Sequence, residues 1–100
     1  MPAIPKADPF RSRAYLDWVK TLPSVVSGRP ADDPHHLIGH GRLGSVKTSD
    51  LWAIPLTRDE HDALHSGGWA RWEEINGLQA MFALRTIEVA VKSGIIVVSG

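Results

Sequence analysis

The chain has 100 residues, 43% of them hydrophobic, and this size predicts one small domain over residues 1–100 with a single core. It contains no cysteine, which excludes disulfides and thiolate metal sites, so any bound metal must be held by nitrogen and oxygen. Eleven Lys and Arg residues balance eleven Asp and Glu residues, and this zero formal net charge argues against a strongly basic nucleic-acid-binding protein.

The N-terminal segment, Met1 to Phe10, carries prolines and charges instead of the apolar core that a signal peptide needs. No apolar run elsewhere approaches the length of a membrane span. We therefore expect an intracellular protein with no membrane partner.

An amphipathic helix is predicted over Phe10 to Leu22, where apolar residues recur at helical spacing, and Pro23 ends it. Ser24 to Pro34 is rich in turn formers and predicts an irregular connection.

Two short strands are predicted next, His35 to Ile38 and Leu51 to Leu56, joined by a long glycine-bearing loop. From His35 to Ser49 the only formal charges are Arg42 and Lys47, so this stretch is locally basic. A bound divalent cation would add to the positive potential there.

Thr57 is a predicted N-cap, and Glu60, three residues later, completes a capping box. The helix that follows is expected over Arg58 to Ser66, and Gly67-Gly68 should end it.

Two further helical segments are predicted, Trp69 to Ile75 and Leu78 to Val91. The apolar residues expected largely on one side of the second are Met81, Phe82, Leu84, Ile87 and Val91. The tail, Ile95 to Val98, has strand character and could pair across a homodimer. The predicted order is therefore helix, hairpin, helix and one or two C-terminal helices, an α+β fold.

Five histidines fall within 31 residues: His35, His36, His40, His61 and His65. Residues four apart on a helix point the same way, so His61 and His65 present two imidazoles suited to a shared ion. Chance spacing on a solvated helix face is the alternative, and the two histidines of the first strand weigh against it. Neighbouring strand residues point to opposite sides, so we expect His35 and His36 to differ in role, one a ligand and one a base.

Histidine suits both roles, because a neutral imidazole binds metal and its ordinary pKa suits a base near pH 7. A metal and such a base together support phosphodiester cleavage. Asp50, fourteen residues after His36, could orient an imidazole, complete the metal shell, or be a turn residue. Asp32 and Asp33, followed by Pro34, are interpreted first as turn residues. His40 could contact phosphate, act as a secondary ligand, or simply be a solvated loop residue.

The segment DPHHLIGHGRLGSVKTSDLWAIPLTRDEHDALH, Asp33 to His65, resembles the HNH, or ββα-metal, endonucleases, particularly the small phage and prophage proteins related to the recombination-enhancement RecA-dependent nucleases. The resemblance implies a ββα-metal core over about residues 33–66, flanked by an N-terminal helix and one or two C-terminal helices. It implies that His35, His61 and His65 bind the metal and that His36 is the general base. Asp50 is the nearest candidate for the middle Asn of the family signature.

The function implied is that of a metal-dependent DNA endonuclease in phage recombination or DNA processing, in the cytoplasm of a bacterial host. Its cofactor would be one divalent ion, either zinc or another transition metal, with magnesium as an alternative. DNA is the implied partner, and the residues expected at its phosphates are His40, Arg42, Lys47 and Arg58. A RecA-type recombinase is a further implied partner, yet the chain has no long basic extension with which to bind a filament.

Many relatives in that family carry a structural zinc knuckle made of cysteines. The corresponding positions here are Ser24, Ser27, Thr57 and Glu60. We therefore expect no structural zinc, and expect packing and the capping box to stabilise this region.

Two rival interpretations remain open. The run from His61 to His65, HDALH, is close to the HExxH of zinc proteases, but Asp62 is shorter than the glutamate base and no histidine follows downstream. A non-catalytic, metal-stabilised DNA-binding or adaptor module is the other. Three histidines with an open fourth position favour catalysis, because structural zinc usually has four protein ligands.

Overall fold

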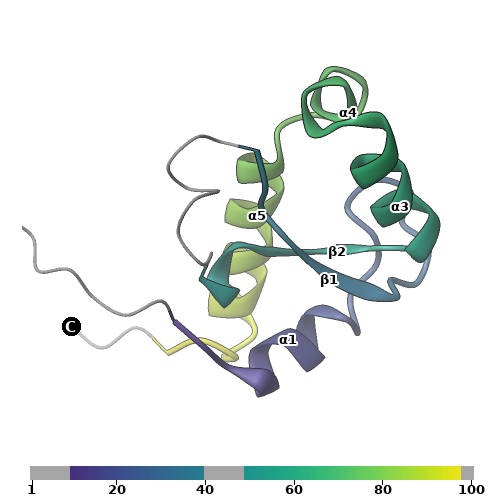
Figure 1. Ribbon diagram of the computed structural model, residues 1–100. Coiled ribbons are helices and arrows are strands. Elements are labelled where there is room, and N and C mark those ends of the chain that lie inside the picture. Colours follow the sequence, from purple (N-terminus) through teal and green to yellow (C-terminus); the bar gives the residue numbers. More distant parts are fainter. Residues whose placement is uncertain (1–9, 40–48, 98–100) are drawn as a thin grey trace, which may run out of the picture.

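The computed structural model describes residues 10–39 and 49–97. Over these ranges the chain is an α+β fold with a two-stranded antiparallel sheet at its centre and α-helices around it (Figure 1). The N-terminal half comprises α1 (Arg13–Val19), β1 (Asp33–His36), the short 3₁₀ helix η1 (Asp50–Trp52) and β2 (Ala53–Leu56). The C-terminal half comprises α3 (Arg58–Gly67), α4 (Trp69–Asn76) and α5 (Gln79–Lys92).

The helix α3 begins as the sequence predicts. Thr57 Oγ1 accepts a hydrogen bond from the Glu60 backbone N–H, and a Glu60 carboxylate oxygen accepts one from the Thr57 N–H at 2.8 Å, which together form the predicted capping box. Gly68 follows the helix with φ +88°, a conformation that glycine adopts without steric cost. The start of α3 is therefore set by residues adjacent to it in the chain.

The first strand lies two residues earlier than predicted, at Asp33–His36, and pairs with β2 in a register that places Pro34 opposite Pro55. The interpretation of Asp33 as a turn residue is therefore wrong. Both strands of a two-stranded sheet are edge strands, where a proline without an N–H is tolerated. As the first residue of β1, Asp33 lies in the sheet beside α3, within hydrogen-bonding distance of His61.

The strand β2 is the centre of packing, because all four of its residues are buried and α1, α3 and α5 each contact it. The main core cluster joins β2 to the three C-terminal helices through Ile54, Leu56, Leu64, Trp72, Phe82 and Ala83. A smaller cluster of Tyr15, Val19 and Ala90 joins α1 to α5. The hairpin and α3 are thus held against one another by buried apolar side chains.

The predicted apolar side of the last helix is wrong in part. Phe82 is buried as expected, but Met81, Leu84 and Val91 are exposed. Smaller residues of α5, among them Ala83, are buried in their place. Short side chains let the helix lie close to its neighbours, so the buried face follows the fit between elements and not side-chain size alone.

The tail also differs from its prediction, since Ile95 to Val97 form no strand and Val98 lies outside the described residues. The backbone N–H groups of Ile95 and Ile96 donate to the Ala90 carbonyl, which turns the chain back at the end of α5. Ile96 packs against the smaller core cluster.

Within the described ranges, no helix combines the length and the apolar character needed to cross a bilayer.

Candidate metal centre

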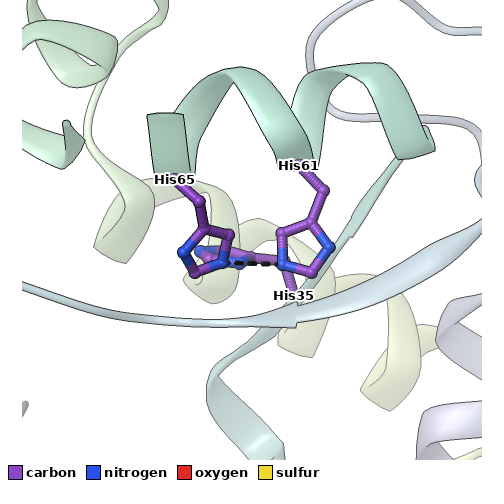
Figure 2. Close-up of side chains that lie close together, drawn as sticks. All are labelled: His35, His61 and His65. Carbon is purple, nitrogen blue, oxygen red and sulfur yellow. Dashed lines mark hydrogen bonds between the residues drawn. The ribbon is translucent and has the colours of Figure 1, made fainter. Parts of the chain in front are cut away.

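Three imidazoles meet between β1 and α3 (Figure 2). His35 comes from the strand, and His61 and His65 come from the helix. One ring nitrogen of each lies within 4.8 Å of the others, and the Nε2 atoms of His61 and His65 are 3.0 Å apart. The structure therefore brings together the three residues that the sequence predicts as ligands.

Local structure accounts for this convergence. A single residue, Thr57, joins β2 to α3, so the helix starts at the end of the hairpin. His61 and His65 are about one helical turn apart and face the same side. His35, paired opposite Ile54 in the sheet, turns its ring toward them, with ring centroids 4.8 Å from His61 and 5.6 Å from His65.

Outer hydrogen bonds determine which ring nitrogens of His35 and His61 carry a proton. His61 Nδ1 lies 3.2 Å from Asp33 Oδ2, and His35 Nε2 lies 2.9 Å from Gln79 Oε1. A carboxylate oxygen and an amide oxygen only accept hydrogen bonds, so the ring N–H groups lie on those sides. A neutral imidazole has one N–H and one lone pair, which leaves the lone pairs on His61 Nε2 and His35 Nδ1.

The donor set fits a single divalent ion. A tetrahedral zinc ion with bonds of about 2.0–2.1 Å holds its nitrogen ligands roughly 3.3 Å apart. The 3.0 Å between the Nε2 atoms of His61 and His65 is close to this value, and a ring nitrogen of His35 lies within 4.8 Å of both. Imidazole ligands suit zinc and other transition ions. Among the residues that the structure describes, the group has three members, one fewer than a closed structural zinc site.

His35 is the buried member of the group, with 1% of its surface exposed. Burial lowers the pKa of its imidazole to about 4, and the hydrogen bond to Gln79 opposes only part of this effect. The ring is therefore neutral near pH 7, which is the form that a metal ligand requires.

This lowered pKa predicts acid sensitivity of the metal-free protein. Between pH 6.5 and about 4 the unfolded chain binds a proton at His35 that the folded chain does not, so stability should fall as the pH drops through this window. The expected loss is about 3 kcal/mol, and it should be absent in His35→Gln. Urea denaturation of both proteins across this range, with chelator present, measures the difference. Parallel pH profiles would contradict the prediction.

Asp33 is a site residue that the sequence interpretation missed. Its carboxylate accepts from His61 Nδ1 and also from Arg58, at 3.0 Å from Nε and 3.1 Å from Nη2. The hydrogen bond from Arg58 is the main cause that lowers the pKa of Asp33, so the group stays ionised. An ionised carboxylate behind a ligand histidine fixes its tautomer and raises its basicity.

We expect Asp33→Asn to weaken metal binding by about 10–100-fold, because the amide loses the charge that supports His61. Isothermal titration with Zn²⁺ measures the affinity. Asp59→Asn is the matched control, since Asp59 is an exposed acid in the first turn of the same helix, and its affinity should equal that of the wild type. Equal losses in the two variants would show a general effect of charge and not a role for Asp33.

His36 and Asp50, the predicted catalytic residues, form a second group. His36 Nε2 lies 2.9 Å from Asp50 Oδ1. Asp50 is buried, and it also accepts from the Ser12 backbone N–H at 2.7 Å and from Arg11 Nη1 at 3.1 Å. Burial raises the pKa of Asp50, but the hydrogen bonds, led by that of His36, outweigh it and hold the pKa below its usual value. Asp50 therefore orients an imidazole, one of the roles left open for it.

The residues expected at phosphate fall into two groups. His40, Arg42 and Lys47 lie outside the described residues. Arg58 lies at the start of α3 and is paired with Asp33, with 68% of its side chain exposed. Through Asp33 it lies next to the three-histidine cluster.

The four positions that correspond to the zinc knuckle do lie together. Ser24 Oγ donates to Glu60 Oε1 at 2.5 Å, and the N–H groups of Val26 and Ser27 donate to Ser24 Oγ. Burial raises the pKa of Glu60, yet the hydrogen bonds, that of Ser24 foremost, lower it further than burial raises it. A network of hydroxyl and carboxylate groups thus ties the turn after α1 to the start of α3.

Comparison with known proteins gives a family but no function. Residues 2–94 match a family model described as a protein of unknown function, DUF968. A relative from Escherichia coli (strain K12), described as the uncharacterized protein YdfU, is 42% identical over 94 residues. The match covers 93% of this chain but 27% of that relative, so the chain spans about a quarter of the relative's length. No solved structure matches significantly. The chain belongs to the DUF968 family.

Proposed function

We propose that this chain is a metal-dependent DNA endonuclease of the HNH, or ββα-metal, type. One observation carries the proposal: His35 lies in a three-histidine cluster while its neighbour His36 is paired with a buried carboxylate. A ligand set and an oriented imidazole at adjacent positions are the two components that metal-assisted hydrolysis requires. The order of hairpin and helix around them is the one that the ββα-metal core has.

The proposed base is His36. Since its Nε2–H donates to Asp50, the lone pair is on Nδ1. In the reaction, Nδ1 takes a proton from a water molecule as the water oxygen attacks phosphorus and the bond to the leaving sugar oxygen breaks. Asp50 keeps the imidazole in this tautomer and stabilises the imidazolium that forms, so it acts as a positioning residue.

The proposed ligand atoms are His35 Nδ1, His61 Nε2 and His65 Nε2. A divalent ion held there would stabilise the negative charge on the phosphate and on the leaving oxygen. Neutral imidazoles favour zinc or another transition ion, while magnesium remains an alternative for the catalytic form. Asp33 accepts the outer N–H group of His61, which keeps the lone pair on His61 Nε2. This nitrogen accepts the hydrogen bond from His65 Nε2–H, a proton that a bound ion would displace.

Attraction to DNA must be local in this proposal, because the chain as a whole has no net charge. We assign it to Arg58 near the ligands and to Arg42 and Lys47 in the basic stretch, which would contact backbone phosphates without reading sequence. Phage recombination or DNA processing in the bacterial cytoplasm is the setting we propose for the activity, with a RecA-type recombinase and a homodimer as further partners to be tested.

A plasmid-nicking assay tests the proposal. The protein is incubated with supercoiled plasmid and, separately, with single-stranded and branched DNA, in Zn²⁺, Mn²⁺ or Mg²⁺. We expect open-circular or linear product with at least one ion, and no product with a chelator. If the protein binds metal but cleaves none of these substrates, the proposal of nuclease activity is wrong. That result would favour a non-catalytic, metal-stabilised DNA-binding or adaptor module.

A further inference from the structure

A buried amide at the start of α5 has no part in the chemistry proposed above, yet it contacts the ligand cluster. Gln79 is fully buried, with 0% of its surface exposed. It lies 44 positions after His35 in the sequence, and its Oε1 is 2.9 Å from His35 Nε2. A buried polar side chain in a small core carries a desolvation cost unless each of its polar atoms finds a partner.

Four other hydrogen bonds satisfy this side chain and its backbone. The Ile38 N–H donates to Gln79 Oε1 at 3.2 Å, and Gln79 Nε2 donates to the Ile38 carbonyl at 3.1 Å. Gln79 Nε2 also donates to Glu73 Oε2 at 3.0 Å, and the Gln79 backbone N–H donates to the same oxygen at 3.1 Å. The amide therefore links Ile38, two residues after the end of β1, to Glu73 of helix α4.

These partners fix the orientation of the amide independently of His35. If its oxygen and nitrogen were exchanged, the NH₂ group would face the Ile38 N–H, and the oxygen would face both the Ile38 carbonyl and the Glu73 carboxylate. Three hydrogen bonds would become donor–donor or acceptor–acceptor contacts in a buried site. The oxygen must therefore face His35, and the His35 nitrogen beside it must carry the proton.

We propose that Gln79 is a positioning residue that holds His35 in the Nε2–H tautomer, so that Nδ1 presents its lone pair to His61 and His65. This inference rests on the proposed metal site. It extends that site into the last helix, since α4 and α5 set the chemical state of a ligand on β1. In the other tautomer, the proton would be on Nδ1, the nitrogen that we propose as the ligand atom, and His35 could not bind an ion until the proton moved.

The tautomer can be measured without metal, substrate or any substitution. Long-range ¹H–¹⁵N correlation NMR of the wild-type protein in chelator at neutral pH distinguishes a protonated from an unprotonated ring nitrogen by its ¹⁵N shift. We expect a protonated Nε2 and an unprotonated Nδ1 at His35. A protonated Nδ1 would overturn the proposal, whatever happens to any variant.

Gln79→Leu then tests the consequence for binding, because leucine keeps an apolar fit and removes the acceptor. We expect the His35 tautomer to become mixed, and Zn²⁺ affinity in titration calorimetry to fall by about 10–100-fold, as for other residues that orient a ligand. Thr86→Val is the matched control. Thr86 is a second buried polar residue of α5, and its hydroxyl donates to the Phe82 carbonyl within the helix.

The outcomes separate this inference from the proposed function. Loss of affinity in both variants in equal measure would show a general effect of altering the core and would overturn the role of Gln79. If the wild type binds Zn²⁺ and Gln79→Leu binds it with unchanged affinity, the proposed role of Gln79 is also wrong. A wild-type protein that binds no Zn²⁺ would overturn the proposed metal site itself. Should Gln79→Leu fail to fold, the wild-type NMR measurement still decides the tautomer.

Discussion

His36→Ala is expected to cleave DNA about 10²–10⁴-fold more slowly than the wild type while it keeps its metal, which is the usual contribution of a general base. The substitution removes the nitrogen that accepts the proton of the attacking water. It leaves the ligand cluster intact, because the His36 side chain is bonded to Asp50 and not to the three histidines. Single-turnover nicking at saturating metal gives the rate, and elemental mass spectrometry gives the metal content.

Two controls sharpen this result. Asp50→Asn keeps the volume of the side chain but removes the carboxylate that fixes the His36 tautomer, so its rate should lie between those of wild type and His36→Ala. Added imidazole should partly restore cleavage by His36→Ala, as it can replace the missing base. Wild-type rates in His36→Ala would eliminate the residue as base, and loss of metal from this variant would identify it as a ligand instead.

The double variant His61→Ala/His65→Ala is expected to bind no metal and to show no cleavage. It should also lose the thermal stabilisation that metal gives the wild type. An ion that binds only the folded state, at 100 times its Kd, adds about 2.7 kcal/mol of stability. For a domain of 100 residues this corresponds to a rise in Tm of roughly 10–20 °C. Calorimetric scans with Zn²⁺ and with chelator measure the shift.

The variant should fold normally without metal, because His65 is exposed and the His61 side chain is 27% exposed, so their removal leaves no buried cavity. Its Tm in chelator should therefore match that of the wild type. His36→Ala is the control that must retain the Zn²⁺-induced shift. A double variant that Zn²⁺ still stabilises by the full amount would mean that the ion binds elsewhere, and the ligand assignment would be wrong.

The sequence determined the features that depend on neighbours along the chain. The pairing of His61 with His65 follows from helical periodicity, and the capping box of Thr57 and Glu60 is complete within four residues. The order of the α-helices and the two strands was also predictable from turn residues and apolar periodicity. The 3₁₀ helix η1 was not predicted, since it occupies the start of the strand expected over Leu51 to Leu56. The helix and the two histidines that it carries could therefore be located before any contact was known, whereas the choice of His35 as the third member came from the family resemblance.

The tertiary structure alone decided which side chains stand behind the ligands. Asp33 contacts His61 because β1 includes Asp33 and lies beside α3. Gln79 contacts His35 although the two residues are 44 positions apart in the sequence. No local pattern marks either residue, since a hydrogen bond between distant segments depends on how the elements pack. The same reason explains why α5 buries Ala83 in place of Met81. Periodicity along the chain sets where an element lies, while complementary packing between elements selects its buried face and its long-range partners.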